Sequence, residues 1–182
     1  SPGPRAEPVD LVVTYLEMTA PPTRPTAPAP AGLKLTLLRA ERPDPGFYRY
    51  LYGAVGRQWL WVDRAVLDDD ALVTILSDEL VEVYVLYVAG VPAGYAELDR
   101  RRDDEVELAY FGLTPDCIGR GLGRYLLDWA ITAAWTSEPK RVWVHTCSHD
   151  HPRALRVYQR AGFRVYRQEH EPIEDGERLA LV

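Results

Sequence analysis

The sequence predicts an α+β protein in which helices flank a mixed, mostly antiparallel sheet. Strand-like segments at 82–89, 93–100 and 105–114 follow one another through short turns, which is typical of an antiparallel meander. A glycine-rich turn then leads into an amphipathic helix, and a further strand and helix follow. The 182 residues are 47% hydrophobic and 26% charged, which fits one globular domain.

The N-terminal region divides at residue 32. Residues 1–8 are proline-rich, and the β-branched residues of Val9–Thr19 predict a strand. Five prolines between Ala20 and Gly32 exclude a helix or a central strand, so we expect an extended linker or a covering arm. The strand and arm at 1–32 therefore precede a domain at 33–182.

The domain is expected to begin with a strand and two helices. Alternation predicts a strand over Leu33–Ala40. Aromatic residues and leucines at helical spacing predict a helix over Gly46–Val62. Aspartates at the positive end of a helix predict a second one from Asp68 to Leu76.

The second half carries the clearer signals. Glu82–Ala89 and Ala93–Arg100 form a predicted hairpin about a turn at Gly90–Pro92, and Glu105–Thr114 forms the next strand. The later elements are expected at 122–135 (helix), 141–146 (strand), 152–161 (helix, closed by Gly162), 163–168 and 178–182 (strands).

Composition excludes several classes of partner. The formal net charge is −6 and the only lysines are Lys34 and Lys140, so binding to nucleic acid or to an anionic membrane is not expected. The longest uncharged stretch, Val83–Ala96, is too short to span a bilayer. Two cysteines and the lack of a secretory signal pattern favour the cytoplasm.

The turn at Pro115–Gly123 joins a strand to a helix. Glycines let backbone N–H groups point into open space, and the helix N-terminus adds partial positive charge, so the turn suits a phosphate or pyrophosphate. It is not a dinucleotide fingerprint, because Arg124 stands where the third glycine belongs, and no Gly-Lys pair of a P-loop exists. The alternative is an ordinary helix start that contains glycine.

Two segments together resemble the GNAT family of N-acetyltransferases. The family's pyrophosphate loop, Q/R-x-x-G-x-G/A, falls on Ile118–Gly123, and its N-x-x-A-x-x-x-Y-x-x-x-G-F pattern falls on His151–Phe163. Ile118 replaces the usual Gln or Arg, and His151 replaces the usual Asn. The resemblance covers about residues 82–163 and implies splayed parallel strands around a slot for acetyl-CoA. The residues that it places at the cofactor are Ile118, Gly119, Arg120, Gly121, Leu122, Gly123, His151 and Arg153.

The resemblance also implies catalytic roles. The backbone of Phe111, Gly112 and Leu113 is expected to contact pantetheine and the thioester oxygen, with Gly112 as a candidate bulge. Glu107 matches a general base used by some members, and Tyr158 matches the tyrosine that protonates the leaving thiolate. A solvated acidic face and a core tyrosine are the plainer interpretations of these two residues.

The acceptor is expected to be a small-molecule or peptide amine, and acidic composition favours a cationic one. Tyr48 and Tyr52 lie one helical turn apart and are candidates for an aromatic wall beside it. Glu105 shares a strand face with Glu107, and Glu97 on the preceding strand is a weaker alternative base. The N-terminal strand and arm are candidates for pairing across a homodimer.

No metal site is expected. His145, Cys147, His149 and His151 alternate, but an extended strand would place the first and last of them about 20 Å apart, too far to share one ion. Nothing in the sequence assigns a base to Cys147, so an acyl relay through its thiol is not expected either.

The sequence therefore favours an acetyl-CoA-dependent N-acetyltransferase that transfers the acetyl group directly in a ternary complex. One alternative is a non-catalytic acyl-CoA-binding or sensing domain on the same fold. Another is a structural domain whose glycine-rich turn is only a helix start. The presence of both Glu107 and Tyr158 favours catalysis over the sensor.

Overall fold

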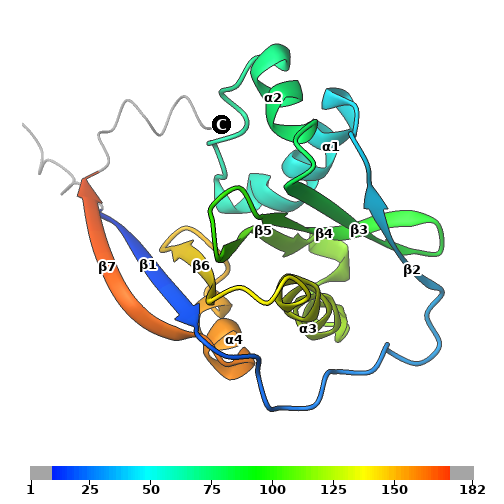
Figure 1. Cartoon of the computed structure of the whole chain (residues 1–182). Coiled ribbons are helices and arrows are strands. Elements are labelled where there is room, and N and C mark those ends of the chain that lie inside the picture. Colours follow the sequence, from blue (N-terminus) through cyan, green and yellow to red (C-terminus); the bar gives the residue numbers. More distant parts are fainter. Residues whose placement is uncertain (1–9, 173–182) are drawn as a thin grey trace, which may run out of the picture.

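The computed structural model describes residues 10–172, which build a seven-stranded sheet in the order β2-β3-β4-β5-β6-β1-β7 (Figure 1). Neighbouring strands are antiparallel except β5 and β6, which run parallel. The strands are β1 (Asp10–Met18), β2 (Leu35–Ala40), β3 (Val81–Val88), β4 (Val91–Asp99), β5 (Glu105–Leu113), β6 (Arg141–Cys147) and β7 (Arg164–Pro172). The helices are α1 (Pro45–Gly56), α2 (Asp69–Leu76), α3 (Leu122–Trp135) and α4 (Ala154–Ala161), with 3₁₀ turns η1 (Arg57–Trp59) and η2 (Pro115–Cys117).

The mixed, mostly antiparallel α+β fold expected from the sequence is confirmed. The segments at 1–8 and 178–182 lie outside the described residues. None of the helices within residues 10–172 is long and apolar enough to cross a membrane.

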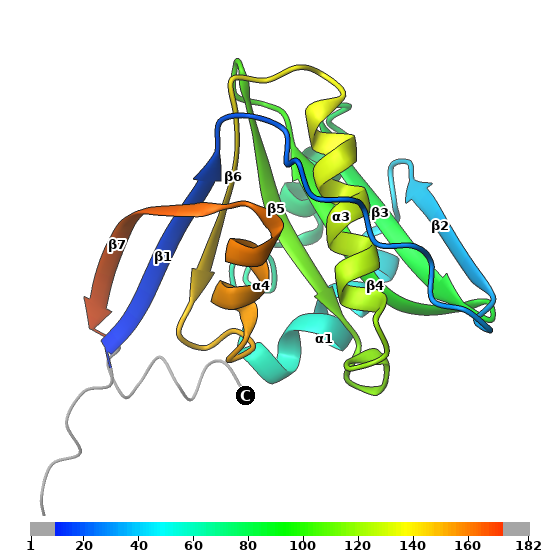
Figure 2. The same ribbon diagram turned by 90° about the horizontal axis from the view of Figure 1, so that it is seen from below.

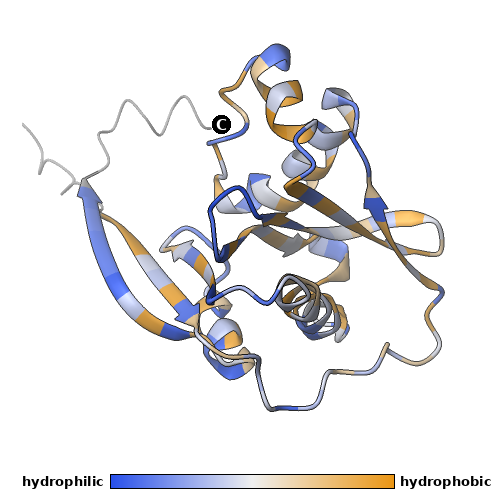
Figure 3. Ribbon diagram, in the orientation of Figure 1, coloured by the Kyte–Doolittle hydropathy of each residue, from blue (hydrophilic) through white to orange (hydrophobic). Residues whose placement is uncertain are grey.

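Helices cover the two faces of the sheet with two separate apolar cores. α3 and α4 pack on one face, around Leu98, Leu126 and Phe163, while α1 and α2 pack on the other, around Leu51 and Leu72 (Figure 1). The central strands are apolar, whereas β7 at the sheet edge is largely hydrophilic (Figure 3). A polar edge strand is one way in which proteins discourage edge-to-edge pairing.

Helix α1 ends at Gly56, six residues before the end predicted at Val62. The reason is that the chain folds back: Trp61 N–H donates to the Gly56 carbonyl at 3.1 Å, and the indole ring lies where a Cβ on Gly56 would stand. At the other end, Asp44 caps the helix by accepting from Gly46 N–H at 2.7 Å. Asp68 caps α2 in the same way through Ala71 N–H at 2.8 Å.

The β3–β4 hairpin is tighter than predicted. Its turn consists of Ala89 and Gly90, with φ of 51° and 82°, so Val91 and Pro92 already belong to β4. Two central residues with positive φ make the turn that best matches the twist of the flanking strands.

The N-terminal strand β1 is built into the sheet between β6 and β7 (Figure 1). It pairs with β6 from Val13 to Met18 and with β7 from Asp10 to Glu17. Most of both edges of β1 is therefore paired within its own chain, among the residues that the structure describes.

The proline-rich segment 20–32 crosses the outer side of α3, as expected of a covering arm (Figure 2). Its anchor is Asp128, a buried α3 residue whose carboxylate is ion-paired with Arg24 and accepts from Ala27 N–H at 2.7 Å. Farther along, Pro30 lies near Gly121, at the start of α3.

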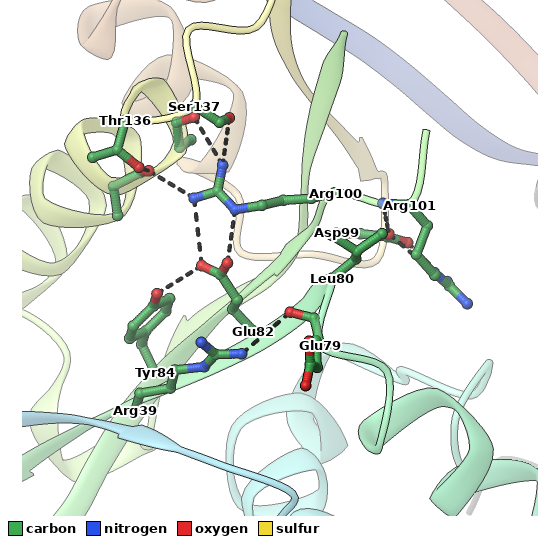
Figure 4. Close-up of polar contacts among 12 residues, drawn as sticks. Arg39, Glu79, Leu80, Glu82, Tyr84, Asp99, Arg100, Arg101, Thr136 and Ser137 are labelled. Atoms are coloured by element: carbon green, nitrogen blue, oxygen red, sulfur yellow. Dashed lines mark hydrogen bonds and ion pairs between the residues drawn. The ribbon is translucent and has the colours of Figure 1, made fainter. Parts of the chain in front are cut away.

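Arg100 ties the C-terminal end of α3 to the sheet (Figure 4). Its guanidinium donates to the carbonyls of Ala133 and Ala134, at 2.7 and 3.2 Å, and pairs with Glu82 at 2.7 Å. Burial would raise the pKa of Glu82, but hydrogen bonds from Arg100 and Tyr84 outweigh it and hold that pKa below its ordinary value. Cations are favourable at this end of a helix, where carbonyls lack partners.

We expect Arg100→Met to lower the free energy of unfolding by about 2 kcal/mol. The substitution leaves the mostly buried Glu82 carboxylate with the Tyr84 hydroxyl but no counter-charge, and it removes a donor from two helix-end carbonyls. Urea denaturation at pH 7 measures this. Since the pKa of Glu82 is depressed in the folded state, the stabilisation is present above pH 4.5 and is lost as pH falls below it. The control is Arg101→Met, which removes a more exposed pair with Asp99 and should cost well under about 1 kcal/mol. Equal losses for the two variants would contradict this assignment.

Candidate functional site

The candidate site lies where β5 and β6 part. The two strands pair at only three positions, the last joining Glu107 to Trp143. Immediately beyond, Leu98 of β4 is opposite Leu108 but Glu97 is opposite Tyr110, so Ala109 is an extra residue in β5, a β-bulge. Beyond Glu107, the edge of β5 that faces β6 has no strand partner among the described residues.

The bulge also exchanges the faces of β5. Val106 and Leu108 face α3, and simple alternation would place Tyr110 there as well. Instead Phe111 packs with the α3 core and Tyr110 with the α1 core. The expectation that Gly112 marks the bulge is therefore wrong, because the irregularity is three residues earlier.

Gly112 has a different role. A Cβ on this residue would stand 2.5 Å from Cγ1 of Val55 in α1, so only glycine lets the helix approach β5 this closely. Next to it, the buried Leu113 packs against Gly123 at the start of α3. The end of β5 and the glycine-rich turn are thus held side by side.

The glycine-rich turn has the geometry of an anion site. Gly119 and Gly121 have φ of 83° and 79°, a backbone conformation that other residues rarely adopt, and Gly121 is the N-cap of α3 without a side-chain cap. Within residues 10–172, no protein acceptor pairs with the backbone N–H groups of residues 119–124. Of the predicted contact residues, Ile118 and Arg120 are exposed, whereas Leu122 is buried and offers only its backbone.

Helix α4 brings Tyr158 against the end of β5. The Tyr158 ring packs between Phe111 and Phe163, with centroid distances of 6.2 and 5.8 Å. Burial, and to a lesser extent the charge of Asp150, raise the pKa of Tyr158 above its ordinary value. At neutral pH this residue is therefore a phenol that can donate a hydrogen bond.

His151 shapes the start of α4. Its Nδ1 accepts from the backbone N–H of Arg153 at 3.0 Å, and its ring packs edge-on against Trp59. An asparagine side chain makes the same local hydrogen bond, which explains how histidine serves at a position where the pattern has Asn. The Arg153 side chain is exposed.

The two predicted carboxylates of β5 have different partners. Glu105 forms an ion pair with Arg141, whose Nε is 3.2 Å from Oε1, and Arg141 also pairs with Glu17. Glu107 instead faces His145 of β6, with 3.4 Å between Oε1 and Nδ1. Sequence reasoning missed this role of His145, because only the parallel register of β5 and β6 brings it beside Glu107, two residues beyond Trp143.

Tyr48, Tyr52 and Glu97 belong to a buried polar network. The Tyr48 hydroxyl donates to Glu97 at 2.6 Å, and the Arg64 guanidinium binds the other carboxylate oxygen at 2.6 Å. Glu97 is 0% exposed, so a direct role for it as base or acceptor contact does not fit this arrangement. Arg64 is a second residue that sequence reasoning missed.

Tyr48 and Tyr52 do line a cavity of about 260 Å³ beside this network. Trp61 forms another wall of the cavity, and its Nε1 donates to Asp150 of the β6–α4 loop at 2.9 Å. The remaining lining residues are Arg49, Gly53, Arg57, Leu60, Arg64 and Ala65. This cavity and the parting strands are therefore adjacent, with Trp61 between them.

The alternating residues His145, Cys147, His149 and His151 run from β6 into the loop that follows it. Within residues 10–172, no group of three or more His, Cys, Asp or Glu side chains could hold a metal ion. Burial raises the pKa of the Cys147 thiol, which disfavours the thiolate needed for an acyl relay.

Comparisons with known proteins agree with this geometry. The sequence model of the acetyltransferase (GNAT) family matches residues 40–163. No curated protein matches the chain significantly.

Several solved structures share the fold at low identity. A GCN5-related N-acetyltransferase from Sphaerobacter thermophilus has a TM-score of 0.63 at 19% identity, over 89% of this chain and 50% of that one. An IAA acetyltransferase from Bacillus cereus has 0.56 at 20%, over 74% and 79% of the two chains. An aminoglycoside acetyltransferase from an uncultured soil metagenomic sample has 0.57 at 14%, over 70% and 87%. The chain also spans only 63% of a functionally unknown protein from Staphylococcus epidermidis with this fold.

The fit of α1 against β5 can be tested with Gly112→Ala. We expect a loss of about 1–3 kcal/mol in the free energy of unfolding, because the added methyl overlaps Val55. In a Val55→Ala background the same substitution should cost less than about 0.5 kcal/mol, since the overlapping methyl groups are gone. Urea denaturation of the two single variants and the double variant measures these losses. If the losses of the single variants simply add in the double variant, contact with Val55 is not the reason why residue 112 is glycine.

Proposed function

Because the chain belongs to the acetyltransferase (GNAT) family, we propose that it transfers the acetyl group of acetyl-CoA to a primary amine by direct attack in a ternary complex. The observation that carries this proposal is the glycine-rich turn. Its six backbone N–H groups, at the positive end of α3 and directly beside the end of β5, have no acceptor among the described residues.

Residues 118–123 are the proposed cradle for the CoA pyrophosphate. Two glycines with positive φ aim the backbone outward, and no side chain caps the helix. The unpaired edge of β5 at Phe111, Gly112 and Leu113 is the proposed contact for pantetheine and the thioester oxygen. Bound acetyl-CoA would supply the acetyl group as a thioester at this edge.

The side chains at the parting strands fit amide formation. The amine must be neutral to attack, and a group that takes up its proton has to lie close by. Glu107 and its partner His145 are partly exposed there, with 18% and 37% of their side-chain surfaces accessible. On the opposite face of β5, Tyr158 can donate its hydroxyl hydrogen to the departing sulfur.

Direct transfer is favoured over a covalent relay. The pKa of Cys147 is raised by burial, so its thiol is a poor nucleophile. Holding both substrates at one site makes the attack effectively unimolecular, which supplies much of the rate without a covalent intermediate.

The acceptor is proposed to be a cationic small-molecule or peptide amine. Asp63, Asp150 and Glu107 all lie near His145, and the chain carries a net charge of −6. The acetyltransferases of similar fold are named for acceptors as different as aminoglycosides and IAA, so the fold itself does not select one. The cavity lined by Tyr48, Tyr52 and Trp61 is the proposed site for the body of the acceptor.

The cradle can be tested with a matched pair of glycine variants. Gly119 and Gly90 have φ of 83° and 82°, and a Cβ at either would meet nothing within 4 Å, so a side chain costs the same backbone strain at both. We expect Gly119→Glu to weaken acetyl-CoA binding at least about 30-fold, because the carboxylate repels the pyrophosphate, while Gly90→Glu binds as the wild type does. Isothermal titration calorimetry measures both.

Binding by the wild type that both variants retain would remove residues 118–123 as the pyrophosphate site. No binding by the wild type would overturn the proposed function. Binding without acetylation of any amine would favour the non-catalytic acyl-CoA sensor.

Tyr158→Phe tests the leaving-group role. We expect kcat to fall about tenfold or more, because the sulfur loses its donor, while the Kd of acetyl-CoA changes less than about threefold. Thiol release with a panel of primary amines (a polyamine, an aromatic amine and a lysine-containing peptide) gives kcat, and calorimetry gives Kd. If kcat and acetyl-CoA affinity fall by similar factors, the role of Tyr158 is to pack the site and not to donate to the sulfur.

A further inference from the structure

His145 is placed to meet the acceptor at the point of transfer. It lies on β6 two residues beyond Trp143, the last residue that pairs with β5. Alternate residues of a strand share a face, so His145 projects to the same side of the sheet as Trp143 and Glu107. The 3.4 Å between its Nδ1 and Glu107 Oε1 agrees with this placement.

The two nitrogens of His145 have different surroundings. Nδ1 is buried and faces Glu107, and it has no well-formed hydrogen bond within residues 10–172. Nε2 is not among the buried atoms that lack a partner, and none of the described residues hydrogen-bonds to it, so it reaches the surface. The exposed side-chain fraction is also larger for His145 than for Glu107, 37% against 18%. Of this pair, the imidazole is the group presented to an incoming substrate.

We propose that His145 is the catalytic residue that takes the proton from the attacking amine, and that Glu107 is a positioning residue that holds the imidazole through Nδ1. This inference rests on the proposed acetyl transfer and names its proton acceptor. As the C–N bond forms and the C–S bond breaks, one amine proton passes to Nε2 of His145. The sulfur receives a proton from the Tyr158 hydroxyl, and solvent restores both side chains.

The charges around His145 suit this role. Glu107 of β5 faces it, Asp63 approaches from the loop after η1, and Asp150 approaches from the β6–α4 loop. From β1, the Tyr15 ring lies 5.8 Å away, itself hydrogen-bonded to Glu169 and covered by Arg167 of β7. The contact with Glu107 raises the pKa of His145 above its ordinary value, against the opposing effect of burial. A base whose pKa lies near the working pH is unprotonated in a large share of molecules and still binds the transferred proton strongly enough to drive the step.

The test compares the pH dependence of turnover in His145→Asn, Glu107→Gln and the wild type, using acetyl-CoA and the best substrate of the amine panel. Asparagine keeps a polar group near the position of Nδ1 but cannot accept the proton. The control is His170→Asn, on exposed edge strand β7 and outside the site. Ionisation of the amine affects every profile equally, so differences between profiles belong to the protein.

We expect the wild-type kcat/KM to rise with pH through an apparent pKa above 6.5, where His145 becomes neutral. This rise is the ascending limb of the pH profile. His145→Asn should lower kcat about 100-fold or more, remove this limb and leave the KM for acetyl-CoA within about threefold. Glu107→Gln should lower kcat only about tenfold and move the limb to lower pH, because the imidazolium loses its carboxylate. His170→Asn should match the wild type. If His145→Asn fails to fold, His145→Gln replaces it.

Two results would overturn the role of His145. One is a kcat within threefold of wild type in the His145 variant. The other is abolished turnover in Glu107→Gln with the limb retained in His145→Asn, which would make the carboxylate itself the base. A wild type that acetylates no amine would instead overturn the proposed function.

A second readout is independent of any acceptor. In NMR titration of the histidine Cε1–H signals, the His145 signal is identified by its loss in His145→Asn. Its pKa should exceed 6.5 in the wild type and fall in Glu107→Gln. A value at or below 6.5 in the wild type would show that Glu107 does not hold the imidazole.

Discussion

The bulge at Ala109 interrupts β5 two residues after the last residue that pairs with β6, and the arrangement of the candidate site depends on this interruption. Three residue pairs hold the parallel strands together, and beyond them the only strand that pairs with β5 within residues 10–172 is β4. An extra residue bends its strand and increases the local twist, so a continued parallel ladder is no longer available. One edge of β5 is thereby left with backbone groups that a ligand can bind.

The same bulge determines which side chains meet at this point. It turns Phe111 toward Tyr158 on one face of the sheet and Tyr110 toward Trp61 on the other. Gly112 then lets α1 approach closely, and Leu113 packs against the start of α3. One irregularity therefore places the proposed cofactor contacts on one side of the sheet and the proposed acceptor contacts on the other.

The carboxylates near the site differ in role because they differ in burial and partner. Glu97 is enclosed and is held by Arg64 and Tyr48, and Glu105 is paired with Arg141. Breaking a buried pair such as Arg64–Glu97 is costly, so Glu97 serves the framework. Glu105 is partly exposed, but its carboxylate is engaged by Arg141. Glu107 faces an imidazole whose second nitrogen reaches the surface, which makes this pair the one suited to proton transfer.

The sequence by itself determined the local features of this protein. Alternation and turn residues placed the meander of β3, β4 and β5, because those signals act between near neighbours along the chain. The glycines of residues 119–123 identified the proposed phosphate loop, since a positive φ beside a helix start requires glycine. Only the tertiary structure decided what distant segments do together. It inserted β1 between β6 and β7, ended α1 where Trp61 folds back, and set the register that brings His145 to Glu107. Register and strand order follow from packing between residues far apart in sequence, and no local pattern encodes them.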